Sequence, residues 1–204
     1  MSLKKAGLII FLILLVDQCI KVYVKTHFHI GESIKVFGLD WFQIYFVENE
    51  GAAWGAQLPG EYGKIILSLF RLIIAPLIGY WLYKSVKDNA PKLLIISISL
   101  IFAGAVGNII DSLLYGVIFE SSDNGNIASF LPGEGYASPL YGKVVDMLYF
   151  PFIKNATFPT WLPFIGGKTF TFFNAIFNIA DMAISTGVGI LLVFNKRIFP
   201  KVAS

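Results

Sequence analysis

Four long apolar stretches restrict this chain to folds that cross a membrane. A helix rises about 1.5 Å per residue, so about 20 apolar residues span the roughly 30 Å hydrocarbon core of a bilayer. Of the 204 residues, 56% are hydrophobic and only 14% are charged, which is too few charges to cover a soluble globule of this size. We predict an all-α polytopic membrane protein that forms a single membrane domain over residues 1–204. The four predicted transmembrane helices are residues 8–23, 65–83, 93–114 and 172–194.

Lysine and arginine residues flank these spans on one side. They occur before the first span, in the loop 84–92 and after the last span. Because cytoplasmic loops retain positive charge, we predict that both termini and this loop lie in the cytoplasm. The segments 26–64 and 115–171 then lie outside the cytoplasm. The net charge of +3 is explained by this topology and does not indicate nucleic-acid binding.

The sequence contains few residues that bind metals or form disulfides. The single cysteine, Cys19, lies within a span and excludes an intramolecular disulfide or a thiolate cluster. The only histidines, His27 and His29, both lie beside the first span. The sequence therefore gives little support to a zinc centre, and we expect no metal and no cofactor.

The last predicted span, 172–194, carries polar residues. Asn174, Asn178, Asp181 and Ser185 follow one another at helical spacing, which predicts that they share one face of the helix. Asp181 is expected about a third of the way into the span, and an ionisable residue inside a membrane indicates a functional site. The alternative is a polar stripe that only joins helices.

Other polar side chains gather toward the same end of the spans. Asp17 and Lys21 are i, i+4 neighbours that can neutralise one another. Asn108 and Asp111 share a face at the outer end of the third span. Arg71, in the outer part of the second span, is expected to face the interior and balance a carboxylate.

Small residues in the third span favour close contact with a neighbouring helix. Ala103, Gly104 and Gly107 form one small-residue surface. Such surfaces let two helix backbones approach closely within a membrane.

The outer segments have different compositions. Residues 32–57 alternate between apolar and polar side chains, which predicts a small β-cradle on the outer membrane face, with Trp41 and Tyr45 at the interface. In the outer loop region 115–171, residues 120–141 are rich in Gly, Ser, Asn and Pro and predict an exposed loop. Residues 150–171 are rich in aromatic residues and proline, and suit a segment that lies on the bilayer surface.

Two carboxylates among apolar neighbours, Asp146 and Asp181, could form a catalytic pair. If they meet, repulsion and a low dielectric make them share one proton, so that one acts as base and the other as acid. Such a pair activates water against an amide carbonyl without a metal. Asn178 and Asn108 could orient the pair or donate to the developing oxyanion. These residues support an intramembrane aspartyl hydrolase.

Two other classes of protein stay open on this reasoning. A small transporter or proton relay could use the carboxylates of Asp17, Asp111, Asp146 and Asp181, but such a relay needs carboxylates spread through the depth of the bilayer. Here they gather toward one face, which favours cleavage near the surface. A non-catalytic assembly scaffold is the other alternative, and it applies if Asp146 and Asp181 do not meet.

The chain resembles lipoprotein signal peptidase, also called signal peptidase II, over nearly its whole length. Five motifs in the same order carry the resemblance. They are Asp17-Gln18, Asn49-x-Gly51-Ala52-Ala53, Gly104 to Asp111, Gly142-x-Val-Val-Asp146, and Phe177-Asn178-x-Ala180-Asp181.

The resemblance implies an enzyme of the bacterial inner membrane, with its active site toward the periplasm, and we expect it to be a monomer. It implies an endopeptidase that removes the signal peptide from diacylglyceryl-modified prolipoproteins, on the amino side of the lipidated cysteine. Prolipoprotein and membrane lipids are the implied partners. Asp146 and Asp181 match the catalytic aspartates, and Asp17 matches a structural or substrate-proximal position. The implied supporting residues are Asn49, Gly51, Asn108, Asp111 and Asn178.

The sequence departs from the family in two respects. Ser112 stands where the family usually has arginine, so Arg71 is a candidate for the missing charge partner. The stretches 117–141 and 147–171 are longer than is common in the family. They could change substrate gating or partner contacts, or be neutral surface additions.

Overall fold

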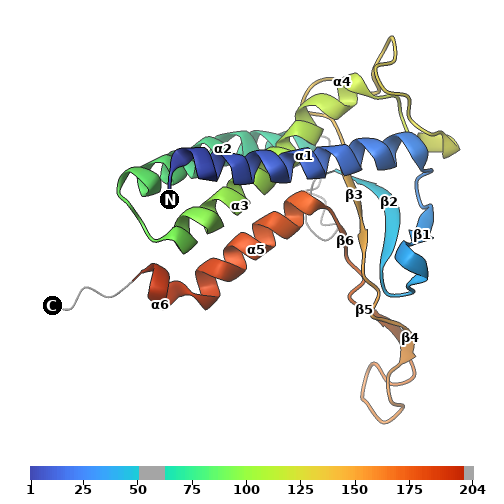
Figure 1. Ribbon diagram of the computed structural model, residues 1–204. Coiled ribbons are helices and arrows are strands. Elements are labelled where there is room, and N and C mark those ends of the chain that lie inside the picture. The colour runs from blue at the N-terminus through green and yellow to red at the C-terminus, as the bar shows by residue number, and fades with distance from the viewer. Residues whose placement is uncertain (51–62, 200–204) are drawn as a thin grey trace.

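Four principal helices and two small sheets make up the fold (Figure 1). The computed structural model describes residues 1–50 and 63–199, so the predictions for Gly51 and for residues up to 57 lie outside the described residues. The amino terminus and the last helix lie at the same end of the helices (Figure 1). The helices are α1 (Leu3–His27), α2 (Gly63–Lys87), α3 (Lys92–Ile110), α4 (Gly116–Ile118), α5 (Ile179–Val193) and α6 (Asn195–Ile198).

Three of the predicted spans are confirmed as helices that are long and apolar enough to cross a membrane. The first two are α1 and α2. The third begins with α3 and continues through a π-helical turn, Asp111–Tyr115, into α4. Large apolar side chains remain exposed along α1 and α2, as expected for surfaces that face lipid.

The prediction of a helix from residue 172 is wrong at its start. Residues Thr169–Phe172 and Ile176–Phe177 are strands, and α5 begins only at Ile179. Asn178 ends the extended segment because its side chain caps the helix, accepting a hydrogen bond from the backbone N–H of Asp181 at 2.9 Å. Asp181 therefore lies in the first helical turn, and Asn174 is not on the helix. At 15 residues, α5 is shorter than the other three.

The larger sheet has four antiparallel strands in the order β1-β2-β3-β6. Strands β1 (Ser33–Lys35) and β2 (Gln43–Asn49) lie within the predicted cradle. The other two, β3 (Val144–Tyr149) and β6 (Ile176–Phe177), come from residues for which no sheet was predicted. The fold is therefore helical with a sheet at one end, and not all-α.

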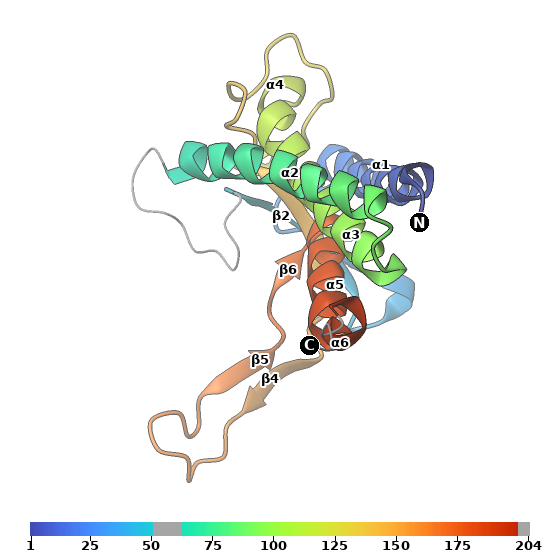
Figure 2. The same ribbon diagram turned by 90° about the vertical axis from the view of Figure 1, so that its left-hand side faces the viewer.

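A separate two-stranded hairpin consists of β4 (Ile153–Thr157) and β5 (Thr169–Phe172). It projects from the sheet and runs across the direction of α1, as the two perpendicular views show (Figures 1 and 2).

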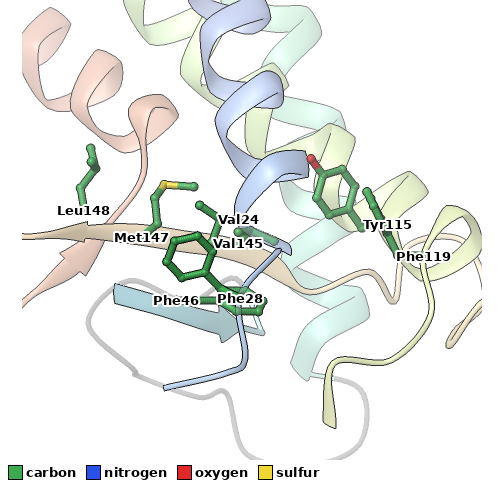
Figure 3. Close-up of a cluster of buried hydrophobic side chains, with 8 residues drawn as sticks. All are labelled: Val24, Phe28, Phe46, Tyr115, Phe119, Val145, Met147 and Leu148. Carbon is green, nitrogen blue, oxygen red and sulfur yellow. The ribbon is translucent and has the colours of Figure 1, made fainter. Parts of the chain in front are cut away.

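An apolar core joins the sheet to the ends of the helices (Figure 3). Strand β3 passes through its centre, and every residue from Val144 to Leu148 is buried. The core fixes β3 against α1 and the end of the α3 segment. The buried members are Val24, Phe28, Phe46, Tyr115, Phe119, Val145, Met147 and Leu148.

The segment 120–141 is mostly exposed, as its composition predicted, but a buried residue within it anchors it to the rest of the fold. Ser122 is buried and its hydroxyl accepts a hydrogen bond from Lys25 Nζ at 2.9 Å. Lys25 also forms a buried ion pair with Glu48 of β2. Because a buried ammonium needs acceptors around it, these contacts tie the segment to α1 and the sheet.

Close packing of α3 on α5 depends on glycine, as predicted. A Cβ atom at Gly104 would lie 2.2 Å from the carbonyl oxygen of Ala180, and one at Gly107 would lie 3.1 Å from the Ala180 Cβ. On α5, a Cβ at Gly187 would lie 2.7 Å from the carbonyl oxygen of Ser97. These glycines set the position of α5, and therefore of Asp181.

Substitution Gly104→Ala is expected to destabilise the protein by about 1–3 kcal/mol, because the new methyl group overlaps the α5 backbone. The thermal midpoint in detergent measures the effect. Gly189→Ala, at a position on α5 where a Cβ would meet no atom within 4 Å, is the matched control and should not lower the midpoint, because alanine is the better helix former. Equal midpoints for the two variants would contradict this role of Gly104.

Candidate active site

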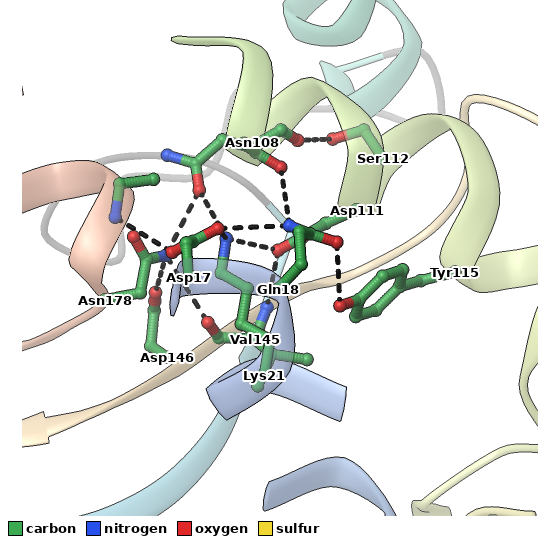
Figure 4. Close-up of polar contacts among 12 residues, drawn as sticks. Asp17, Gln18, Lys21, Asn108, Asp111, Ser112, Tyr115, Val145, Asp146 and Asn178 are labelled. Carbon is green, nitrogen blue, oxygen red and sulfur yellow. Dashed lines mark hydrogen bonds and ion pairs between the residues drawn. The ribbon is translucent and has the colours of Figure 1, made fainter. Parts of the chain in front are cut away.

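A buried polar cluster lies where α1, α3, β3 and α5 meet (Figure 4). At its centre, Lys21 Nζ lies 2.9 Å from Asp17 Oδ2 and 2.8 Å from Asp111 Oδ2. The lysine side chain is 0% exposed. The predicted Asp17–Lys21 pair is confirmed, and its extension to Asp111 is a finding of the structure. One ammonium is thus shared by carboxylates from two helical segments.

Asp17 also positions the start of α5. Its Oδ1 accepts a hydrogen bond from the backbone N–H of Ala180 at 2.9 Å. The first N–H groups of a helix have no partner within the helix, so a carboxylate there both satisfies a donor and is favoured by the helix dipole. Gly107 makes room, since a Cβ there would lie 2.9 Å from Asp17 Oδ2.

Asp111 joins α3 to α1 and to β3. It accepts hydrogen bonds from Gln18 Nε2 at 3.0 Å and from the backbone N–H of Val145 at 3.3 Å. The Tyr115 hydroxyl donates to Gln18 Oε1 at 3.1 Å. These contacts fix the strand residue immediately before Asp146.

Asn108 holds Asp181. Its Oδ1 accepts from Lys21 Nζ at 3.1 Å, and its Nδ2 donates to Asp181 Oδ1 at 2.8 Å. An ammonium group can only donate, so Lys21 selects the amide orientation in which the oxygen of Asn108 faces Lys21 and the nitrogen faces Asp181.

Asn178 links the two candidate catalytic carboxylates. Its Nδ2 donates to Asp146 Oδ1 at 2.7 Å and to Asn108 Oδ1 at 3.1 Å. Its Oδ1 accepts from the Asp181 backbone, as described above. Asp146 and Asp181 therefore belong to one hydrogen-bonded network.

Asp146 is only 3% exposed. Asn49 Nδ2 donates to its Oδ2 at 3.2 Å, and Asn178 donates to its other oxygen. Burial, together with the negative charge of Asp181, raises the pKa of Asp146 to about 7. This carboxyl group therefore retains a proton near neutral pH, as expected for one member of a coupled pair.

Two more residues that the sequence singled out, Arg71 and Ser112, lie on α2 and in the π-helical turn after α3. Arg71 is half-buried on α2. Ser112 is buried, and its hydroxyl donates to the backbone oxygen of Asn108 at 3.1 Å.

Lys21 is a direct partner of Asp111, which the sequence pattern did not predict. The i, i+4 spacing pairs Lys21 with Asp17 alone, and Arg71 was the predicted compensating charge. The adjacent Asp17-Gln18 motif was the signal that this turn of α1 belongs to the site. Among the described residues, 1–50 and 63–199, no group of three or more His, Cys, Asp or Glu side chains could hold a metal ion.

Apolar helices of membrane-spanning length, with a buried cluster of carboxylates and amides at one end, define a polytopic membrane enzyme. Comparison with known proteins gives the family. The family model described as Signal peptidase (SPase) II matches residues 9–196, and the chain belongs to this family of bacterial membrane proteases.

Individual relatives agree with this assignment. The lipoprotein signal peptidase of Porphyromonas gingivalis is 48% identical over 196 residues, which cover 95% of this chain and 84% of the relative. That of Amoebophilus asiaticus is 34% identical over 93% of this chain and 76% of its own length. A solved bacterial membrane enzyme, determined by the in meso method at 2.3 Å resolution, superposes with a TM-score of 0.63 at 25% identity, covering 99% of this chain and 94% of that one.

Proposed function

We propose that this protein is an aspartyl endopeptidase that removes the signal peptide from diacylglyceryl-modified prolipoproteins. It cuts on the amino side of the lipidated cysteine, at the periplasmic side of the inner membrane, as a monomer with both termini in the cytoplasm. The observation that carries the proposal is the shared amide network of Asp146 and Asp181, in which burial raises the pKa of Asp146 to about 7. The family and the named relatives support the substrate class.

In this mechanism the two carboxyl groups have different roles. Asp181 accepts a hydrogen bond from Asn108 and lies in the first turn of α5, where the helix dipole favours negative charge. We assign it as the base that takes a proton from water while the water oxygen attacks the scissile carbonyl. Protonated Asp146 gives its proton to the carbonyl oxygen as the tetrahedral intermediate forms. As that intermediate collapses, Asp181 gives the proton it took from water to the leaving nitrogen and the C–N bond breaks. Asp146 takes back a proton from a hydroxyl of the intermediate as the new carboxyl group forms.

The position of the site suits a substrate that is itself a membrane helix. The network lies where α5 begins and β3 passes the helices, in the second half of α1 and near the end of α3 (Figure 4). A scissile bond near the outer membrane surface would lie at this level. Because Asn49 of β2 contacts Asp146, the sheet would lie beside a peptide bound at this carboxyl group.

The proposal is tested by incubating the purified protein in detergent with a diacylglyceryl-modified prolipoprotein. The same prolipoprotein without the lipid is the matched substrate, and a chelator is added to one arm. We expect cleavage of the lipidated substrate that survives the chelator, and no cleavage of the unlipidated one. Absence of cleavage by well-folded protein would instead favour a proton relay through the buried carboxylates.

The pH dependence follows from the state of Asp146. As the acid, Asp146 must be protonated, and its pKa is about 7. The ratio kcat/KM is therefore expected to fall by about tenfold per pH unit above that value. Initial rates between pH 5 and pH 9 measure the profile, with substrate solubility checked at each pH. A rate that rises steadily through this range would contradict the assignment of Asp146 as the acid.

A further inference from the structure

The β4–β5 hairpin presents apolar side chains that no other part of the described structure covers. Trp161 is 78% exposed and Phe164 is 94% exposed, both in the connection between the two strands. Phe152, Ile153 and Phe172 are exposed on the strands themselves or beside them. Large apolar side chains exposed to this degree are unfavourable in water and indicate a surface that contacts another apolar phase.

The hairpin has the orientation needed to contact a membrane surface. It runs across the direction of α1 in both perpendicular views (Figures 1 and 2). Because α1 crosses the bilayer, a segment that runs across it extends along the membrane plane. The hairpin also leaves the sheet at the end of the helices where β6 meets α5, which places it at the level of the interface.

The charge of the hairpin complements an anionic surface. Residues 150–173 contain Lys154 and Lys168 and no aspartate or glutamate. Basic residues near a membrane are attracted to anionic headgroups, and aromatic rings are favoured at the same depth. The occupant indicated by these properties is a lipid headgroup layer, since an acidic protein partner would not explain the exposed tryptophan and phenylalanine together with the orientation along the membrane.

The hairpin is an ordered unit connected to the site. Phe158 stacks on Phe170 with ring centroids 4.2 Å apart, and its backbone N–H donates to the Lys168 oxygen at 3.0 Å. At the base, the Phe173 ring contacts those of Phe152 and Phe177. Phe177 directly precedes Asn178, so the depth of the hairpin is mechanically linked to the start of α5.

We propose that the hairpin 152–173 is a membrane-interface anchor, with Trp161 and Phe164 inserted among the headgroups and upper acyl chains of an anionic bilayer leaflet. This inference goes beyond the proposed peptidase activity and does not depend on the catalytic pair Asp146 and Asp181. It requires only that the helices cross the membrane.

The test uses the full-length protein with Trp161 as its only tryptophan, after Trp41, Trp54 and Trp81 are each replaced by phenylalanine. The protein is reconstituted into phosphatidylglycerol-containing vesicles with lipids brominated near the headgroup end of the acyl chains. We expect Trp161 to emit at a shorter wavelength than free tryptophan in buffer. We also expect its emission to be quenched by the brominated lipid and only a little by aqueous iodide. A matched protein that retains Trp81 alone, on the membrane-spanning α2, verifies reconstitution.

A second variant tests the charge. Lys154→Glu with Lys168→Glu is expected to reduce bromolipid quenching of Trp161 in anionic vesicles more than in vesicles of phosphatidylcholine alone. Quenching of Trp161 by iodide and not by brominated lipid would overturn the proposal. Protection from both quenchers would overturn it as well, because the ring would then be covered by protein.

Discussion

Replacing either Asp146 or Asp181 with asparagine is expected to lower prolipoprotein cleavage by about 10²–10⁴-fold or more, because each change removes one partner of the proton transfer. Asparagine keeps the size of the side chain but can neither accept the proton of water nor donate a proton as an acid does. The initial rate with a saturating lipidated substrate measures the effect. Asp40→Asn, at an exposed carboxylate paired with Lys35 in the cradle, is the matched control and should cut at the wild-type rate.

The thermal midpoint, measured as a function of pH, checks that these variants fold and also tests the protonation state of Asp146. Its pKa in the folded protein lies above the ordinary value of 3.8, so the folded state binds more protons than the unfolded state between that value and about 7. This contribution to stability is complete below the ordinary value and is lost as the pH rises through about 7. Asp146→Asn should therefore show a shallower decline of thermal midpoint over this range. Substantial cleavage by either variant would rule out catalysis by the pair Asp146 and Asp181.

The second large effect is expected at Lys21, where Lys21→Met should destabilise the protein by about 3–5 kcal/mol. The change leaves the buried carboxylates of Asp17 and Asp111 without their shared ammonium. Unfolding in detergent, followed by circular dichroism, measures the loss. Lys35→Met is the matched control, because that lysine pairs with Asp40 on the surface, where an ion pair contributes about 0–1 kcal/mol.

A combined variant separates charge balance from packing at this site. Adding Asp17→Asn and Asp111→Asn to Lys21→Met removes the uncompensated charges and is expected to recover part of the lost stability. If the triple variant were no more stable than Lys21→Met alone, lost packing around the lysine stem would explain the effect instead. Activity should stay low in the triple variant, since Asn108 loses the donor that orients its amide toward Asp181.

The helices and the charge pair within α1 could be predicted because they depend on local patterns. Apolar runs identify α1, α2 and α3, and the i, i+4 spacing places Asp17 beside Lys21. Glycine spacing likewise predicted the face of α3 that packs closely on a neighbouring helix, which the structure identifies as α5. Each of these inferences concerns residues within one element.

The start of α5 could not be predicted from the same patterns. Helical spacing placed Asn174 and Asn178 on one face, but a capping asparagine and a mid-helix asparagine are equivalent in a periodicity argument. The difference lies in long-range contacts, because Asp17 binds the Ala180 N–H from another helix. The partner of Asp111 was missed for the same reason, since Lys21 reaches it across the α1–α3 contact.

The cap at Asn178 has a consequence for biosynthesis. Ribosomes make α1, α3 and β3 before α5, so the pairing of Lys21 with Asp17 and Asp111 can form while the chain is still emerging. Asn178 and Asp181 arrive later, and the amide bridge from Asp146 to Asn108 is incomplete until they pack. The network that joins Asp146 to Asp181 is therefore completed only when the last long helix packs against the rest of the protein.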